Sequence, residues 1–415
     1  MSSIYAPANE ASQPLGLRRV ESVAAAEPAG PRFSSRHIPA LDGVRAIAVL
    51  LVMISHFRSV FDDAPFRSRW LSQHLFRLFE VGWCGVDLFF ALSGLLITSI
   101  LLDSKGGVNY FKRFYWRRAF RIFPVYYIFL FLMLGVLSRL VHPNPWHNLN
   151  PGWYLSYLVN WKPNHGSTDR LIGQAWSLAV EEQFYLVWPL LVLCLSVRNL
   201  LRLCLGGVAV ALIFRIALTF QGASVAAVYC LTPARMDSLL FGAIIAIGIR
   251  DVRITSVLRT IGLPLRVLSL AVIAGIVVLT RSLGYQTAAM HTVGFTAFGS
   301  FFSLSVFEAY FLQSGVAFRL LTASLLGRIG RYSYTMYLIH IPLHRIIYVP
   351  ILKGLAGRAD AIIWTVTILY LFGIFSLTFV VAAVSWHCLE SPILRFAHSL
   401  FPKSGAKECH TSPEG

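Results

Sequence analysis

The sequence predicts an all-α, polytopic membrane protein of about ten transmembrane helices. Of its 415 residues, 56% are hydrophobic and only 13% are charged, whereas a typical soluble domain carries about 25% charged residues. The mean hydropathy is +0.64. Apolar runs near twenty residues recur along the chain, and each can cross roughly 30 Å of hydrocarbon. A membrane β-barrel would instead alternate polar and apolar residues.

Apolar stretches bounded by charges, Gly or Pro define the individual spans. The predicted spans are 42–60, 83–103, 122–141, 176–197, 203–220, 232–249, 266–284, 291–312, 329–349 and 361–388. Most Lys and Arg residues between spans fall in segments that a cytoplasmic N-terminus would place inside, so the positive-inside rule predicts that both termini are cytoplasmic. The net charge of +17 then indicates loops near anionic lipid, and no nucleic-acid partner is expected.

The two ends of the chain differ from its middle. Residues 1–37 are polar and lack the apolar core of a signal peptide, which predicts a disordered cytoplasmic tail. Residues 38–396 form the predicted membrane domain, and residues 397–415 a second short cytoplasmic tail. Six scattered cysteines form no C-x-x-C pair, so we expect them to be inert.

Ionisable residues inside apolar spans are costly to bury and are therefore candidate site residues. Arg45 and His56 are eleven residues apart, which returns to the same helix face roughly 16 Å further along. Histidine can accept and return a proton near neutral pH, although a structural hydrogen bond is the alternative. Asp87 must pair or be protonated, and a carboxylate could fix the tautomer of a nearby histidine. Ser93-Gly94 would allow close helix packing.

Further polar residues follow at helical spacing. Arg118 and Arg121 would share a face and could bind a phosphate, or could simply mark the inner membrane surface. Glu181 lies one turn from both Ser177 and Tyr185, which predicts a polar stripe on the fourth span. The Trp-rich connection 142–175 is either an interfacial aromatic belt or a platform for a sugar ring. No nucleotide-binding, nucleophile-elbow or H-E-x-x-H zinc motif is present.

These segments together resemble the acyltransferase-3 family of integral membrane O-acyltransferases. No single motif is very specific, but the combination of six motifs in this order and spacing is specific. Together the motifs cover about residues 38 to 396. The motifs are the Arg-x10-His of Arg45 and His56, the stretch 87–94, the Arg-x-x-Arg of Arg118 and Arg121, the stretches 176–185 and 334–340, and the Glu-x-Pro of Glu390 and Pro392.

The resemblance implies acyl-CoA, most often acetyl-CoA, as a cytoplasmic donor and a hydroxyl, usually of a glycan, as the acceptor, with no metal. It implies a multi-pass protein of the inner membrane. His56 would either deprotonate the acceptor or carry the acyl group, with Asp87 or Glu181 orienting it. Arg45, Arg118 and Arg121 would hold the CoA phosphates. The expected substrate-binding positions are Trp176, Tyr185, Tyr337, His340 and Glu390.

Two other classes of protein fit part of this pattern. A transporter or flippase of a lipid-linked or small-molecule substrate would also have many spans with buried charges, but the sequence has no inverted repeat. A sensor or scaffold would leave the intramembrane histidine and the paired glutamates unexplained. Many relatives carry an added extracytoplasmic SGNH-type domain after the membrane part; this sequence has none there, so we expect that an extracytoplasmic partner protein could complete the transfer.

Overall fold

The computed structural model describes residues 37–66, 69–137, 150–162, 171–355 and 357–400. These residues form helices and short turns, without a β-strand. The predicted all-α class is therefore confirmed. Most of the predicted terminal tails, and residues 142–149 and 163–170 of the 142–175 connection, lie outside the described residues.

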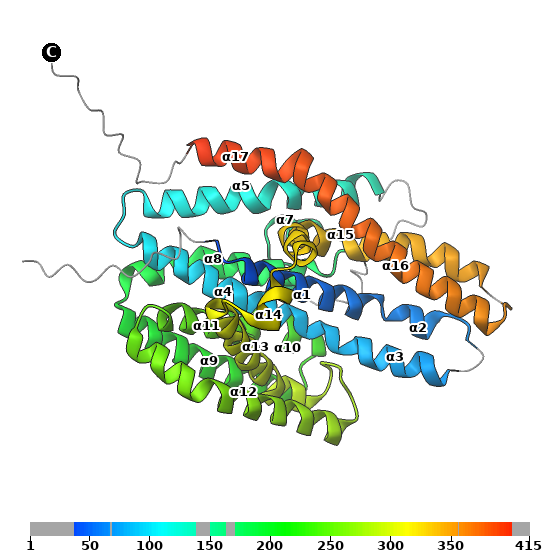
Figure 1. The fold of residues 1–415 in the computed structure, drawn as a ribbon, viewed down its shortest axis with the longest axis horizontal. Coiled ribbons are helices and arrows are strands. Elements are labelled where there is room, and N and C mark those ends of the chain that lie inside the picture. Colours follow the sequence, from blue (N-terminus) through cyan, green and yellow to red (C-terminus); the bar gives the residue numbers. More distant parts are fainter. Residues whose placement is uncertain (1–36, 67–68, 138–149, 163–170, 356, 401–415) are drawn as a thin grey trace, which may run out of the picture.

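The first half of the chain contributes the centre of the bundle and one side of it (Figure 1). Its elements are α1 (Pro39–Phe57), α2 (Ser59–Asp63), α3 (Trp70–Glu80), the 3-10 turn Val81–Cys84, α4 (Gly85–Ser104), α5 (Tyr110–Leu130), the π-helical turn Phe131–Leu137, α7 (Gly152–Leu155), the 3-10 turn Val159–Trp161, α8 (Ala175–Cys194) and α9 (Val197–Phe220).

The second half closes the bundle, and α17 packs along α5 at one edge (Figure 1). Its elements are α10 (Val225–Cys230), α11 (Thr232–Gly248), α12 (Val252–Thr280), the π-helical turn Met290–Gly294, α13 (Phe295–Phe311), α14 (Gly315–Leu321), α15 (Ser324–Gly354), α16 (Asp360–Ser385), the π-helical turn Trp386–Glu390 and α17 (Ser391–Leu400).

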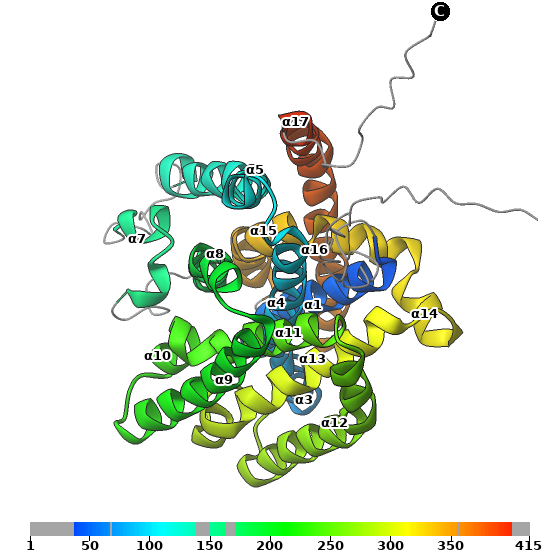
Figure 2. The ribbon, with the colours of Figure 1, turned by 90° about the vertical axis from the view of Figure 1, so that its left-hand side faces the viewer.

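Nine helical segments of the described chain are long and apolar enough to cross a membrane. They match nine of the ten predicted spans. The tenth predicted span, 329–349, lies within α15, which has 31 residues and so a length of about 46 Å. It is not among the nine because its sequence carries several Arg and His residues. Seen end-on, α1, α4 and α11 lie in the middle and α12 at the edge (Figure 2).

Several helices begin earlier than the hydropathy pattern predicts. The second membrane segment is continuous from Trp70, so residues predicted as an outer loop are helical. The segment with Arg118 and Arg121 is likewise helical, as part of α5, rather than a loop before the third span. Charged residues can extend a membrane helix beyond the hydrocarbon layer because helical backbone groups satisfy one another. A hydropathy scan therefore misses these helix starts.

Glycines allow the central helices to approach closely. A Cβ on Gly94 of α4 would overlap the carbonyl group of Leu239 in α11, and one on Gly242 of α11 would overlap that of Ala91 in α4. Gly330 of α15 meets the backbone of Asp42 in α1 in the same way. Small residues at such crossings permit backbone contact in membranes. The packing role expected for Gly94 is confirmed by this geometry.

Candidate active site

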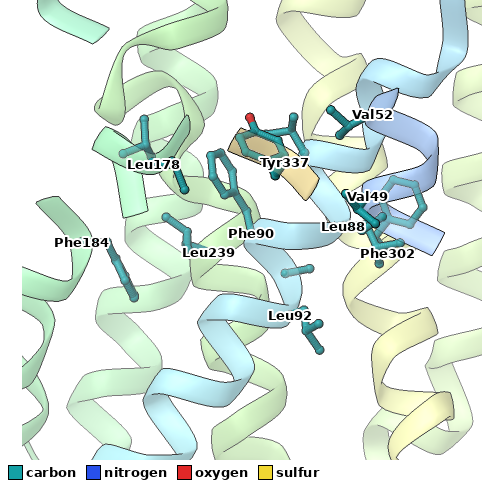
Figure 3. Close-up of a cluster of buried hydrophobic side chains, with 14 of the residues drawn as sticks. Val49, Val52, Leu88, Phe90, Leu92, Leu178, Phe184, Leu239, Phe302 and Tyr337 are labelled. Carbon is teal, nitrogen blue, oxygen red and sulfur yellow. The ribbon is translucent and has the colours of Figure 1, made fainter. Parts of the chain in front are cut away.

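A cavity of about 120 Å³ opens between α1, α4, α5, α8 and α15. Its walls are apolar on the α4 side and polar on the others, and Tyr337 belongs to the apolar cluster that also includes Phe90 and Leu178 (Figure 3). The polar and charged residues that line it are Arg45, Ser93, Arg118, Arg121, Ser177, Glu181, Glu182, Tyr185, Ser333, Tyr334 and Tyr337. All three predicted phosphate-binding arginines therefore face one cavity.

The arginines of this cavity are only partly neutralised. Arg45 donates to Asp42 at 3.0 Å, and the Arg118 guanidinium lies 4.6 Å from the centroid of the Tyr185 ring. Among the residues that the structure describes, neither Arg118 nor Arg121 forms an ion pair with a carboxylate. Neither guanidinium is therefore held in a direct ion pair, although Glu181 and Glu182 line the same cavity. Arginine binds phosphate groups in a bidentate way.

Hydrogen bonds between hydroxyl groups connect the helices that line the cavity. The Tyr185 hydroxyl is hydrogen-bonded to Ser93 of α4. The Tyr337 hydroxyl lies 2.5 Å from the Ser177 hydroxyl and 3.1 Å from the carbonyl oxygen of Gln174. These bonds join α8 to α4 and to α15, so the polar stripe predicted on the fourth span lines the cavity.

His56 is exposed and lies at the end of α1 opposite Arg45. Its Nδ1 atom is 2.9 Å from the carbonyl oxygen of Val52 and 3.2 Å from Nε2 of His340. A backbone carbonyl only accepts hydrogen bonds, so Nδ1 of neutral His56 carries the proton and Nε2 holds the lone pair. Nε2 is then the atom that can take a proton or attack a carbonyl carbon.

His340 is fully buried and fixes His56 from α15. Its own Nδ1 donates to the carbonyl oxygen of Tyr337 at 2.6 Å, which leaves its Nε2 as the acceptor facing His56. The rings of Tyr337 and His340 have centroids 5.7 Å apart. A continuous row of side chains, Tyr337, His340 and His56, therefore leads from the arginine cavity to the exposed histidine.

The other expected site residues have different surroundings. Asp87, expected beside His56, instead accepts hydrogen bonds from Arg235 at 2.7 Å and from Ser238 at 2.8 Å, and is fully buried. In the structure it is His340, not a carboxylate, that contacts Nδ1 of His56. Glu181 faces the arginines in the cavity.

Three expected substrate-binding residues lie outside the cavity wall, namely His340, described above, Trp176 and Glu390. Trp176 packs against the Tyr229 ring with centroids 4.8 Å apart and is buried. Glu390 is also buried and accepts a hydrogen bond from Thr335 at 2.7 Å. Neither is among the lining residues.

Arg235 and Asp237 of α11 each form an ion pair with a residue of a neighbouring helix. Arg235 pairs with Asp87 of α4, and Asp237 pairs with Arg215 of α9 at 2.8 Å. All four side chains are completely buried, so these two ion pairs join α4, α9 and α11 inside the bundle.

Several residues around the site were given no role from the sequence, although the motif stretches 176–185 and 334–340 contain two of them. Glu182 and Tyr334 line the cavity, and His344 lies one turn after His340 on α15. A signal was present in the sequence, because His340 and His344 are four residues apart and so share a helix face. Of the Trp-rich connection, Trp161 donates to Gln183 of α8 at 3.1 Å.

The fold and this site define a multi-pass helical membrane protein with an arginine-lined cavity and a hydrogen-bonded histidine pair. A protein-family model described as "Acyltransferase domain" matches residues 38–387. The chain belongs to this acyltransferase family, as the resemblance implied. Its multi-pass helical architecture makes it a membrane-embedded member. No solved structure matches the chain.

Curated relatives point in the same direction. The "O-acetyltransferase OatA" of Staphylococcus aureus (strain NCTC 8325 / PS 47) is 26% identical over 392 residues, which cover 89% of this chain and 59% of the relative. The "Peptidoglycan O-acetyltransferase OatA" of Listeria monocytogenes serovar 1/2a is 32% identical over 233 residues, or 52% of this chain and 34% of the relative. The "Putative peptidoglycan O-acetyltransferase YrhL" of Bacillus subtilis (strain 168) is 30% identical over 241 residues, or 51% and 33%. The chain thus spans from a third to three fifths of these relatives.

Proposed function

We propose that this chain transfers an acetyl group from acetyl-CoA to a hydroxyl group of a glycan at the outer face of the cytoplasmic membrane. The observation that carries the proposal is the cavity with three arginines, two of which have no carboxylate partner among the described residues. Coenzyme A carries several phosphate charges, and such a cavity suits them. The names of the relatives make peptidoglycan the first acceptor to test.

In this proposal the donor and the acceptor meet at His56. Arg45, Arg118 and Arg121 hold the phosphates, and the long pantetheine arm extends past Tyr337 toward His340. Arg45 and His56 are about 16 Å apart along α1, a gap that an extended arm can bridge. With a cytoplasmic N-terminus, the arginines lie near the inner surface and His56 near the outer one.

His56 then acts through Nε2, either as the general base for the acceptor hydroxyl or as the carrier of the acetyl group. His340 supports both roles, since its Nε2 accepts from Nδ1 of His56 and stabilises the positive charge that develops there. Any partner protein that passes the acetyl group on would bind at the outer face. Transport is the less favoured function because the chain belongs to an acyltransferase family.

The test measures transfer from radiolabelled acetyl-CoA into peptidoglycan fragments by the full chain in proteoliposomes. His56→Gln is expected to lower kcat by about 10²- to 10⁴-fold, the usual contribution of a general acid or base. His74→Gln is the matched control, because His74 also bonds a backbone carbonyl one turn earlier, at 2.6 Å, but lies on α3. Unchanged transfer by His56→Gln would refute the proposed role of His56. An acceptor that crosses the membrane with its mass unaltered would instead establish transport.

A further inference from the structure

A second polar cluster lies one turn beyond the His56–His340 pair. Nε2 of His344 is 3.0 Å from the hydroxyl of Ser59, at the start of α2. Nδ1 of His344 is 2.7 Å from the hydroxyl of Tyr370 on α16. The Tyr370 hydroxyl is in turn 3.3 Å from the backbone carbonyl oxygen of His344. Three helical elements thus bring together a serine, a histidine and a tyrosine.

The hydrogen bonds of this cluster have one consistent direction. The carbonyl of His344 can only accept, so the Tyr370 hydroxyl donates to it. The Tyr370 oxygen then accepts from Nδ1–H of His344, and Nε2 is left to accept from the Ser59 hydroxyl. A nucleophile hydrogen-bonded to a base, with a third group orienting the base, is the arrangement that activates serine.

The surroundings suit a covalent intermediate. His344 is 1% exposed, and its ring stacks on Tyr348 with centroids 5.1 Å apart and lies 5.0 Å from Phe57. Tyr370 is also buried, whereas Ser59 is only partly buried. An apolar wall on the histidine side excludes water that would hydrolyse a serine ester, and the partial exposure leaves the serine within reach of a substrate.

The Ser59–His344 pair lies one helical turn beyond the His56–His340 pair. Ser59 follows His56 by three residues, and Arg58 between them keeps helical backbone angles, so the two side chains lie on neighbouring turns of one face. On α15, His344 follows His340 by one turn. The boundary between α1–α2 and α15 therefore carries two hydrogen-bonded pairs, His56 with His340 and Ser59 with His344.

We propose that Ser59 is a nucleophile that carries the acetyl group between donor and acceptor, with His344 as its base and Tyr370 as a positioning residue. This inference rests on the proposed acetyl transfer. Ser59 Oγ attacks the thioester carbonyl carbon, and its proton passes to Nε2 of His344. The C–S bond then breaks, and the leaving thiolate takes that proton to give free CoA.

The second half of the reaction restores the enzyme. The acceptor hydroxyl attacks the Ser59 ester and its proton passes to Nε2 of His56. The ester C–O bond to Ser59 breaks, the acetylated acceptor leaves, and the proton on His56 returns to Ser59 Oγ. This scheme gives the two histidines separate tasks, His344 in acylation and His56 in deacylation.

Because the two histidines act in different steps, their variants are expected to differ in whether the acetyl-serine intermediate accumulates. The full chain in proteoliposomes is incubated with radiolabelled acetyl-CoA, denatured at acid pH, and digested for peptide mass spectrometry. We expect His56→Gln to accumulate acetyl on Ser59, because deacylation is blocked. Ser59→Ala and His344→Gln are expected to lose both this label and about 10²-fold or more of kcat. Ser72→Ala is the control, since Ser72 is a buried serine of α3 whose hydroxyl donates to the Arg69 carbonyl oxygen.

Ser59→Cys guards against an effect of misfolding. Cysteine keeps the size of the side chain and would form a thioester, whose label neutral hydroxylamine removes while it leaves a serine ester intact. This inference alone would be overturned if the wild type transfers acetyl groups, Ser59→Ala transfers them at the same rate, and Ser59 of the His56→Gln variant carries no label. No transfer by the wild type from acetyl-CoA would overturn the proposed function and the inference together.

Discussion

Removing Asp87 distinguishes a structural carboxylate from a catalytic one. Asp87 accepts hydrogen bonds from Arg235 and Ser238, and both members of the ion pair are fully buried. Asp87→Ala leaves the Arg235 guanidinium without its anion inside the bundle, between the rings of Phe295 and Tyr229. Breaking a buried ion pair on one side costs about 3–5 kcal/mol of folding free energy. We therefore expect a large loss of stability from this single change.

The double variant Asp87→Leu with Arg235→Met separates the two roles. Replacing both charges by apolar side chains of similar volume is often neutral for stability, so the double variant is expected to recover most of the loss. Thermal unfolding in detergent gives the stability, and peptidoglycan acetylation gives the activity. If the pair is structural, stability and transfer recover together.

Two results would refute this reasoning. If Asp87→Ala lowers the free energy of unfolding by less than about 1 kcal/mol, the loss would be that of an exposed pair, and the pair would have no structural role. A double variant that is stable but inactive would restore Asp87 to the catalytic machinery. Glu308→Ala is the control, because Glu308 is half exposed and 3.3 Å from Arg266, so its loss is expected to cost less than about 1 kcal/mol.

Three further changes test the cavity and the packing. Arg118→Gln removes a guanidinium group whose hydrogen bond to a charged partner is worth about 1.5–3 kcal/mol, so KM for acetyl-CoA is expected to rise about tenfold or more. Arg113→Gln is the control, because Arg113 does not line the cavity, and its steady-state kinetics are expected to be unchanged. Gly242→Val places a side chain against a backbone carbonyl of α4 and should lower the folded yield in gel filtration; Gly373→Ala, in open space, should not. Tyr337→Phe loses the hydrogen bond to Ser177 and should lower the free energy of unfolding by about 1 kcal/mol, measured by thermal unfolding; an unchanged value would contradict a role for this hydroxyl in joining α8 to α15.

The architecture and the shared position of the arginines could be predicted because each depends on local spacing. Runs of apolar residues mark nine of the spans directly. The three-residue spacing of Arg118 and Arg121 places both on one face of α5, and both line the cavity. The orientation of the chain stays a prediction from the positive-inside pattern, and the role of each site residue stays a prediction from the resemblance.

The partners of buried polar groups could not be predicted, because they come from helices distant in sequence. Nothing local indicates that Asp87 of α4 would meet Arg235, 148 residues later, rather than His56. The contact between His56 and His340 spans 284 residues, and that between Ser59 and His344 spans 285. Such pairings follow from which helices cross, and here glycines such as Gly330 allow α1 and α15 to approach closely.

The predicted span that is not among the nine apolar segments, α15, carries site residues on successive turns. α15 presents Tyr337 to the arginine cavity, His340 to His56 and His344 to Ser59. Each of these polar groups costs free energy in a membrane unless it has a partner, and His340 and His344 have hydrogen bonds at both ring nitrogens. His340 and His344 lie on one face of α15 and pair with His56 of α1 and Ser59 of α2, and this pairing is the strongest physical reason to seek the chemistry at this boundary.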